Sequence, residues 1–177
     1  MPLFFIEMGQ GIIANGDLKV QTSALFSCTL IAGHNTTTGY GGAYHYPSGN
    51  MSDPGVKLDM DTWAARLRPT AVILVLARGQ ARSNHAPHHH ADPQRPLTSD
   101  EADQLALRNW VTLQLRVAPT TVRAVAAGMQ LNPFEAGSID DLSGDFTPDP
   151  IKVNTRQAGT YQDEGRFTLI GRDRENT

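Results

Sequence analysis

Short apolar runs bounded by glycine or proline recur along the chain and predict β-strands. The run 70–77 (TAVILVLA) is continuously apolar and rich in β-branched residues, which is typical of a strand covered on both faces. The polar segment 34–42, which ends in glycines, predicts a hairpin connection between two strands. The other predicted strands span 3–6, 11–14, 18–21, 24–32, 43–46, 121–127, 151–155 and 167–170. For 24–32 a short buried helix is the alternative, because periodicity alone does not separate the two.

Helical spacing of apolar residues predicts a first helix over 59–68, which begins at Asp59 as N-cap and is ended by Pro69. The residues on its apolar face are Met60, Trp63, Ala64 and Leu67. A second helix is predicted from the capping-box spacing of Thr98 and Glu101 to about Val117. The residues expected on its inward face are Ala102, Ala106, Trp110, Leu113 and Val117.

The order of these elements predicts the fold class. A helix followed by a buried strand is the signature of an α/β layer. The chain has 177 residues, of which 40% are hydrophobic and 19% charged, so it can bury a core. We therefore expect one layered α/β domain over residues 1–177, with a mixed β-sheet packed with helices.

Charge and hydropathy exclude several classes of protein. The net charge is −3, and no pervasive basic field exists, which argues against a nucleic-acid binder. The apolar runs are shorter than the roughly 20 residues that cross a bilayer, so no membrane span is expected. The apolar opening 1–6 has no basic residue and meets Glu7 at once, unlike a signal peptide. Cytoplasmic location is the default expectation, and delivery by a specialised secretion system, which needs no cleavable signal, is the alternative.

Most of the functional interpretation depends on the single cysteine, Cys28. One cysteine excludes an internal disulfide and a cysteine-rich zinc site. Cys28 is either an inert residue of the hydrophobic core or a nucleophile. If the hairpin forms, Cys28 and His45 can face each other across one antiparallel ladder. An imidazole beside a thiol activates it, and a hydroxyl such as Thr22 can orient that imidazole.

The segment from Met8 to Pro47 resembles the CheD chemoreceptor glutamine deamidases and the catalytic domains of cytotoxic necrotizing factor toxins. Their pattern places a cysteine at the end of a Leu-x-Ser/Gly-Cys element, a threonine six positions earlier, and a histidine downstream of a glycine pair. The matching elements in this chain are Met8-Gly9-Gln10, Thr22, Leu25-Phe26-Ser27-Cys28 and Gly41-Gly42-Ala43-Tyr44-His45.

The resemblance implies a CheD-like fold and a protein-glutamine deamidase that converts Gln to Glu and releases ammonia. Cys28 is then the nucleophile, His45 the acid and base, and Thr22 the residue that orients His45. The partner is a protein that carries a reactive glutamine, no cofactor or metal is needed, and transglutamination is the natural side reaction. Tyr44 stands where CheD proteins usually have alanine, and their later Ile-Gly-x-Arg-Asn element is missing. A protein target other than a chemoreceptor follows, as in a toxin or effector.

Two polar clusters offer an alternative. His85, His88, His89 and His90 lie in one proline-interrupted segment, where a solvated loop with adventitious metal affinity is the expected state. The acidic group Asp140, Asp141, Asp145 and Asp149 lacks the order of an EF-hand loop. The competing hypothesis is a non-catalytic module that binds a protein or a metal through these clusters. A papain-like amidase, which would need an Asn or Asp orienter in place of Thr22, is a third hypothesis.

Overall fold

The structure is a computed structural model of the chain, and it describes residues 3–15, 19–22, 25, 27–77, 99–116, 121–125, 134–135 and 167–171. The strands within this part are β1 (Leu3–Ile6), β2 (Gly11–Asn15), β3 (Lys19–Thr22), β4 (Thr29–His34), β5 (Tyr40–Tyr46), β6 (Ala71–Ala77), β7 (Thr121–Val125), β8 (Phe134–Glu135) and β9 (Phe167–Ile170). The helical elements are α1 (Pro54–Leu67), α3 (Ser99–Trp110) and the π-helical segment η1 (Val111–Leu115).

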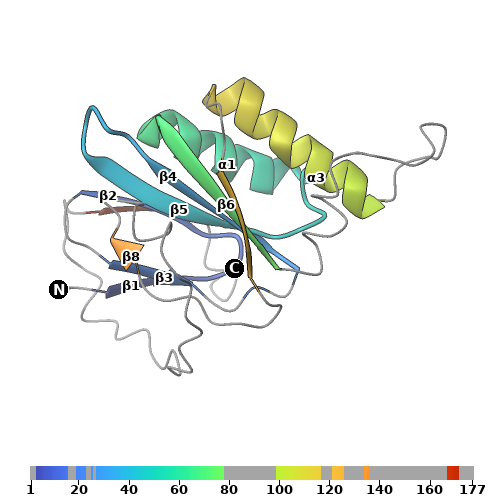
Figure 1. Cartoon of the computed structure of the whole chain (residues 1–177), viewed down its shortest axis with the longest axis horizontal. Coiled ribbons are helices and arrows are strands. Elements are labelled where there is room, and N and C mark those ends of the chain that lie inside the picture. The colour runs from blue at the N-terminus through green and yellow to red at the C-terminus, as the bar shows by residue number, and fades with distance from the viewer. Residues whose placement is uncertain are drawn as a thin grey trace.

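The strands form two sheets (Figure 1). The larger sheet has the order β7-β6-β4-β5-β2-β9, in which β6 and β7 run parallel and the other neighbours antiparallel. The smaller sheet has the order β1-β3-β8, with β1 and β3 parallel and β3 and β8 antiparallel. Both sheets are therefore mixed, and the α/β class expected from the sequence is confirmed.

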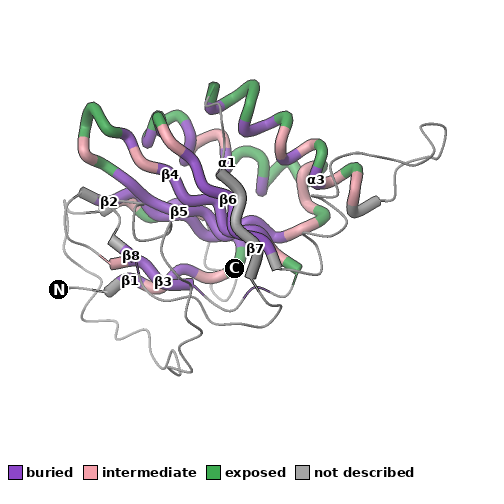
Figure 2. Tube along the Cα trace, in the orientation of Figure 1, coloured by how far each residue is buried: buried purple, intermediate pink, exposed green. Residues whose placement is uncertain are grey.

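The larger sheet lies between two other layers. Figure 1 shows α1 and α3 on one face of it and the smaller sheet on the other. In β6, Val72 and Leu74 pack with the helices, whereas Ile73 and Val75 pack with the smaller sheet. Neighbouring side chains of a strand point to opposite faces, so a strand covered on both faces is apolar throughout. The buried colour along β4, β5 and β6 in Figure 2 marks this central position.

The first helix is longer than its apolar spacing indicated. It begins at Pro54, and its N-cap is Asp53 rather than Asp59. Asp53 Oδ1 accepts hydrogen bonds from the N–H groups of Gly55 at 2.8 Å and Val56 at 3.2 Å. The helix ends before Pro69 as predicted, and the predicted apolar face is buried.

The inward face predicted for the second helix is wrong in part. Ala102 is exposed and Leu113 is 69% exposed, although Trp110 is buried as expected. The residues that form the buried stripe are Gln104, Leu107, Trp110, Val111 and Leu115. Leucine buries more apolar surface than alanine, which favours this stripe, and Val111 and Leu115 of η1 continue it.

The predicted hairpin is confirmed, with different strand ends. β4 begins at Thr29 rather than at residue 24, and β5 begins at Tyr40 rather than at residue 43. The tight connection is held by Asn35, whose Oδ1 accepts from the N–H groups of Thr37 at 3.0 Å and Thr38 at 3.1 Å. Gly39 closes it with a φ of 76°, a value that favours glycine.

Several predictions lie outside the described residues. These are the histidine segment with His85, His88, His89 and His90, the acidic group at 140–149, and the predicted strand 151–155. In the described part of the chain, no helix is long and apolar enough to cross a membrane.

Candidate functional site

His45 lies near the end of β5 and is only 1% exposed. Its backbone is fixed by the segment before β2: the His45 N–H donates to the Gln10 carbonyl at 2.9 Å, and the Gly9 N–H donates to the His45 carbonyl at 2.8 Å. The Met8-Gly9-Gln10 element that the sequence analysis singled out therefore holds the backbone of the candidate catalytic histidine.

Thr22 reaches His45 from the smaller sheet. It ends β3 directly opposite Ile6 of β1. Its Oγ1 lies 2.9 Å from the Ile6 carbonyl oxygen and 2.5 Å from His45 Nδ1. A carbonyl can only accept, so the hydroxyl donates its single hydrogen to Ile6 and must accept from His45. Nδ1 consequently carries the imidazole hydrogen, and Nε2 has the free lone pair.

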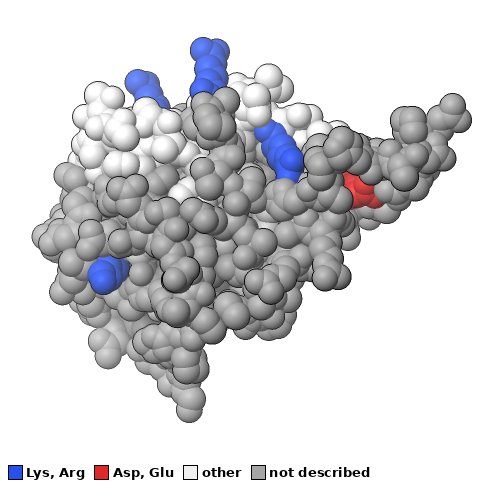
Figure 3. Space-filling model, viewed as in Figure 1, with Lys and Arg blue, Asp and Glu red and all other residues white. Residues whose placement is uncertain are grey.

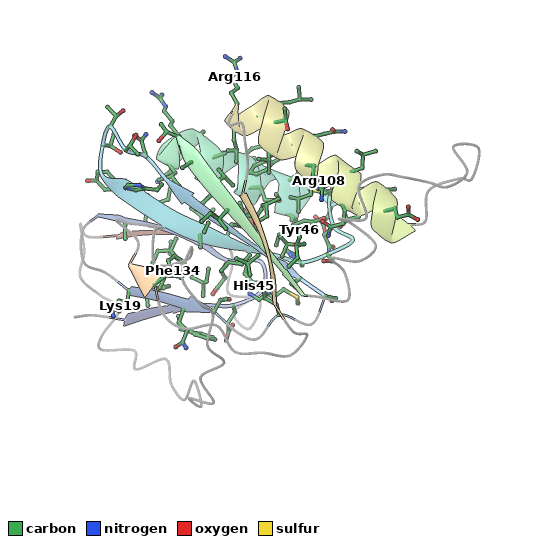
Figure 4. The ribbon with its side chains drawn as sticks, viewed as in Figure 1. Lys19, His45, Tyr46, Arg108, Arg116 and Phe134 are labelled. Atoms are coloured by element: carbon green, nitrogen blue, oxygen red, sulfur yellow. The ribbon has the colours of Figure 1, made fainter. Side chains whose placement is uncertain are left out.

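Burial sets the charge of this imidazole. Removal from solvent lowers the pKa of His45 to about 4, because the charged form loses its hydration. Near neutral pH the ring is therefore neutral, and its Nε2 can accept a proton. Figure 4 shows His45 on the side of the larger sheet that faces the smaller one, together with Phe134 of β8.

Cys28 lies on the same side of the sheet as His45. Leu30 of β4 pairs directly with His45 of β5, so these two side chains share a face. Cys28 precedes Leu30 by two positions and packs against the same apolar cluster. Position 28 stands one residue before β4, where a continuation of the regular pairing would make it the diagonal neighbour of position 45, at roughly 7 Å between Cα atoms. The direct contact of Cys28 Sγ with the imidazole stays a prediction.

The thiol is free and half-buried, next to the exposed Ser27. An inert core cysteine is fully enclosed, whereas a nucleophile needs an approach path for its substrate. Cys28 combines packing against the core with partial access. The structure thus places Thr22, Cys28 and His45 around one end of the β4–β5 hairpin. Leu30, and not Cys28, is the residue directly opposite His45.

Residues after His45 form a polar network that the sequence analysis missed. The Tyr46 hydroxyl donates to Asp103 Oδ1 at 2.5 Å, and burial followed by the Asp103 carboxylate holds the pKa of Tyr46 well above its usual value. Ser48 Oγ donates to the carbonyl oxygen of Ser27. The sequence signal was the adjacency of Tyr46 and Ser48 to His45, but Asp103 is distant along the chain and only the fold brings it there.

A metal site and a surface groove are the other features considered for binding. Among the described residues, no three His, Cys, Asp or Glu side chains lie close enough to hold a metal ion. A groove of about 290 Å³ lies between α1 and η1, lined by residues that include Asp61, Arg68, Gln114 and Leu115. It belongs to the helical layer, on the opposite face of the sheet from His45, and so is separate from the thiol site. In the view of Figure 3, the described Lys and Arg side chains stand apart from one another.

Comparison with known proteins gives no relative. No family model matches the chain, and neither a curated protein nor a solved structure is significantly similar to it.

Proposed function

We propose that this protein is a protein-glutamine deamidase of the CheD-like type, with Cys28 as nucleophile, His45 as acid and base, and Thr22 as the residue that orients His45. The observation that carries the proposal is the placement of the Thr22 hydroxyl between the Ile6 carbonyl and His45 Nδ1. It assigns the hydrogen to Nδ1 and leaves Nε2 as a base on the face that Cys28 shares.

The first half of the reaction forms a thioester. His45 is neutral, so Nε2 accepts the thiol proton as the Cys28 sulfur attacks the glutamine carboxamide carbon. The S–C bond forms while the carbonyl electrons move to oxygen. Backbone N–H groups near Cys28 stabilise this oxyanion. The oxyanion then collapses, the C–N bond breaks, and His45 Nε2 returns the proton to the leaving amine as ammonia departs.

The second half hydrolyses the thioester. His45 Nε2 removes a proton from water, which attacks the acyl carbon. The S–C bond then breaks, and Nε2 returns the proton to the leaving sulfur, which gives glutamate and the Cys28 thiol. A primary amine in place of water gives transglutamination. Because the resting imidazole is neutral, it takes the proton from the Cys28 thiol only when the thiol attacks the substrate. A thiolate–imidazolium pair need not be present beforehand.

The activity is tested on mixed glutamine-containing proteins and peptides. Ammonia release and the mass change of Gln to Glu are measured for the native chain and for Cys28→Ser and His45→Gln. We expect activity only in the native chain, with the variants folded. A folded native chain that releases no ammonia, and whose Cys28 reacts with iodoacetamide no faster than the His45→Gln variant, would favour the non-catalytic binding module.

A further inference from the structure

A short loop, residues 47–51, directly follows the histidine strand β5 on the way to α1 and passes beside the nucleophile. Within this loop, Ser48 Oγ donates a hydrogen bond to the carbonyl oxygen of Ser27. Ser27 immediately precedes Cys28. The loop that follows the candidate base therefore touches the peptide bond that joins Ser27 to the candidate nucleophile.

Asp103 of α3 anchors the loop from outside. Its Oδ1 accepts from the Tyr46 hydroxyl at 2.5 Å and from the Met51 N–H at 3.3 Å. Its Oδ2 accepts from the Gly49 N–H at 2.9 Å. One carboxylate thus binds the residue before the loop and two backbone donors within it, and hydrogen bonds to a charged acceptor are the stronger kind.

Hydrogen bonds within the loop also stabilise its conformation. Asn50 Nδ2 donates to the carbonyl oxygens of Pro47 and Ser48, each at 3.0 Å, and the Asn50 N–H donates to the Tyr46 hydroxyl at 3.2 Å. Gly49 has a φ of 82°, with open space where a Cβ would lie, so backbone conformation rather than packing selects glycine there. These bonds leave Ser48 little freedom in its backbone position.

The hydrogen bond of Ser48 to the Ser27 carbonyl also fixes the direction of the Cys28 N–H. The Ser27 C=O and the Cys28 N–H belong to one planar trans peptide and point in opposite directions. Holding the carbonyl toward Ser48 turns the Cys28 N–H away from the loop. The backbone N–H of a nucleophile is a common donor to the oxyanion that forms when it attacks a carbonyl.

We infer that Ser48 is a positioning residue that aims the Cys28 N–H at the substrate oxyanion, and that Asp103 holds Ser48 in place. This inference rests on the proposed function, since it concerns the same thiol. It assigns a task in catalysis to a loop whose side chains do not contact the reacting atoms.

Two reagents that attack the single cysteine separate this role from a structural one. Iodoacetamide alkylates sulfur by displacing iodide from a saturated carbon, and no oxyanion forms. p-Nitrophenyl acetate acylates sulfur through a tetrahedral oxyanion: the S–C bond forms, the ester C–O bond breaks, and p-nitrophenolate leaves. The ratio of the acylation rate to the alkylation rate therefore reports the oxyanion donor alone.

We expect Ser48→Ala to lower the acylation rate by on the order of 10 to 10² while the alkylation rate stays unchanged. Ser48→Thr, which keeps the hydroxyl, should restore acylation. Asp103→Asn should lower the ratio in the same direction, because the amide nitrogen cannot accept a hydrogen bond. The matched control is Ser52→Ala, at an exposed serine just beyond the loop.

An equal fold-loss of both rates in Ser48→Ala would show a structural role, and native values of both rates would show no role. Either result overturns the inference while the proposed function stands. Failure of the proposed function is seen in the native chain instead. If Cys28 of the native chain reacts with both reagents no faster than Cys28 of the His45→Gln variant, the proposed function is wrong, and the inference about Ser48 is wrong as well.

Discussion

At the scale of single residues, the chemistry of the site depends on how the Thr22 hydroxyl uses its one hydrogen. That hydrogen goes to the Ile6 carbonyl, so the lone pairs of Oγ1 face His45 Nδ1. The hydroxyl thereby acts as an acceptor that orients the ring, the task that a carboxylate or amide performs in known catalytic triads.

Thr22→Val tests this task. Valine keeps the shape but cannot accept from Nδ1. The tautomer with hydrogen on Nε2 is then no longer disfavoured, and the ring loses the hydrogen bond that fixes its orientation. We expect the acylation rate of Cys28 by p-nitrophenyl acetate to fall by on the order of 10². An unchanged rate would assign the orienting role to another group.

Thr29→Val is the matched control, on β4 beside the strand that carries His45. Thr29 Oγ1 is buried and has no hydrogen-bond partner among the described residues. Its removal should leave the acylation rate unchanged and raise the free energy of unfolding by about 1 kcal/mol, because an unsatisfied buried hydroxyl is costly. Urea denaturation measures the gain, and a loss of stability would show that the hydroxyl has a partner in solution.

At the scale of elements, the position of His45 depends on close pairing of β2 with β5. Gly42 lies so near β2 that a Cβ on it would meet the Ile12 carbonyl oxygen at 1.9 Å. That atom belongs to the backbone and cannot rotate away. The glycine pair before His45 therefore allows the strand contact that brings Gly9 and Gln10 to the histidine backbone.

Gly42→Ala should consequently destabilise the fold by at least about 3 kcal/mol. Gly49→Ala is the comparison, since space is open there and only the positive φ opposes alanine, at about 1 kcal/mol. Thermal or urea unfolding of the two variants measures the difference. Equal effects would contradict the close approach at Gly42.

The start of α1 gives a second prediction at this scale. Asp53 caps two backbone N–H groups, so Asp53→Ala should cost about 1 kcal/mol of unfolding free energy. Asp53→Asn keeps the acceptor oxygen and should lose only a fraction of this. Similar losses in both variants would show that the charge, rather than the cap, stabilises the helix.

At the scale of the whole molecule, the burial of His45 between two sheets makes stability depend on pH. The unfolded imidazole takes up a proton below its ordinary pKa of 6.5, whereas the folded one resists protonation until about 4. The unfolded state therefore binds more protons in this interval, and the free energy of unfolding falls as the pH falls through it.

We expect a loss of up to about 3 kcal/mol between about pH 6.5 and about pH 4 from this residue. His45→Gln removes the titrating ring and should show a shallower decline over the same interval. Urea denaturation at several pH values measures both slopes. Identical slopes would mean that solvent reaches the imidazole in the folded protein.

Sequence alone determined the elements whose residues are locally distinctive. The continuous apolar run of β6 predicted a strand covered on both faces, and the glycine-terminated polar segment predicted the β4–β5 hairpin. The hairpin fixed which strands are neighbours, and period-two alternation then put positions 28 and 45 on one face. The boundary at Asp53 was missed because the apolar spacing marked only the buried part of α1.

Only the tertiary structure decided how the site is completed. The Ile6 carbonyl, which orders the Thr22 hydroxyl, comes from a different strand, and Asp103 comes from the second helix. Backbone acceptors leave no signature in a side-chain pattern, and a pairing of distant residues depends on how sheets and helices pack. The same packing buries His45 and lowers its pKa, because desolvation is a property of the surrounding layers rather than of the residue.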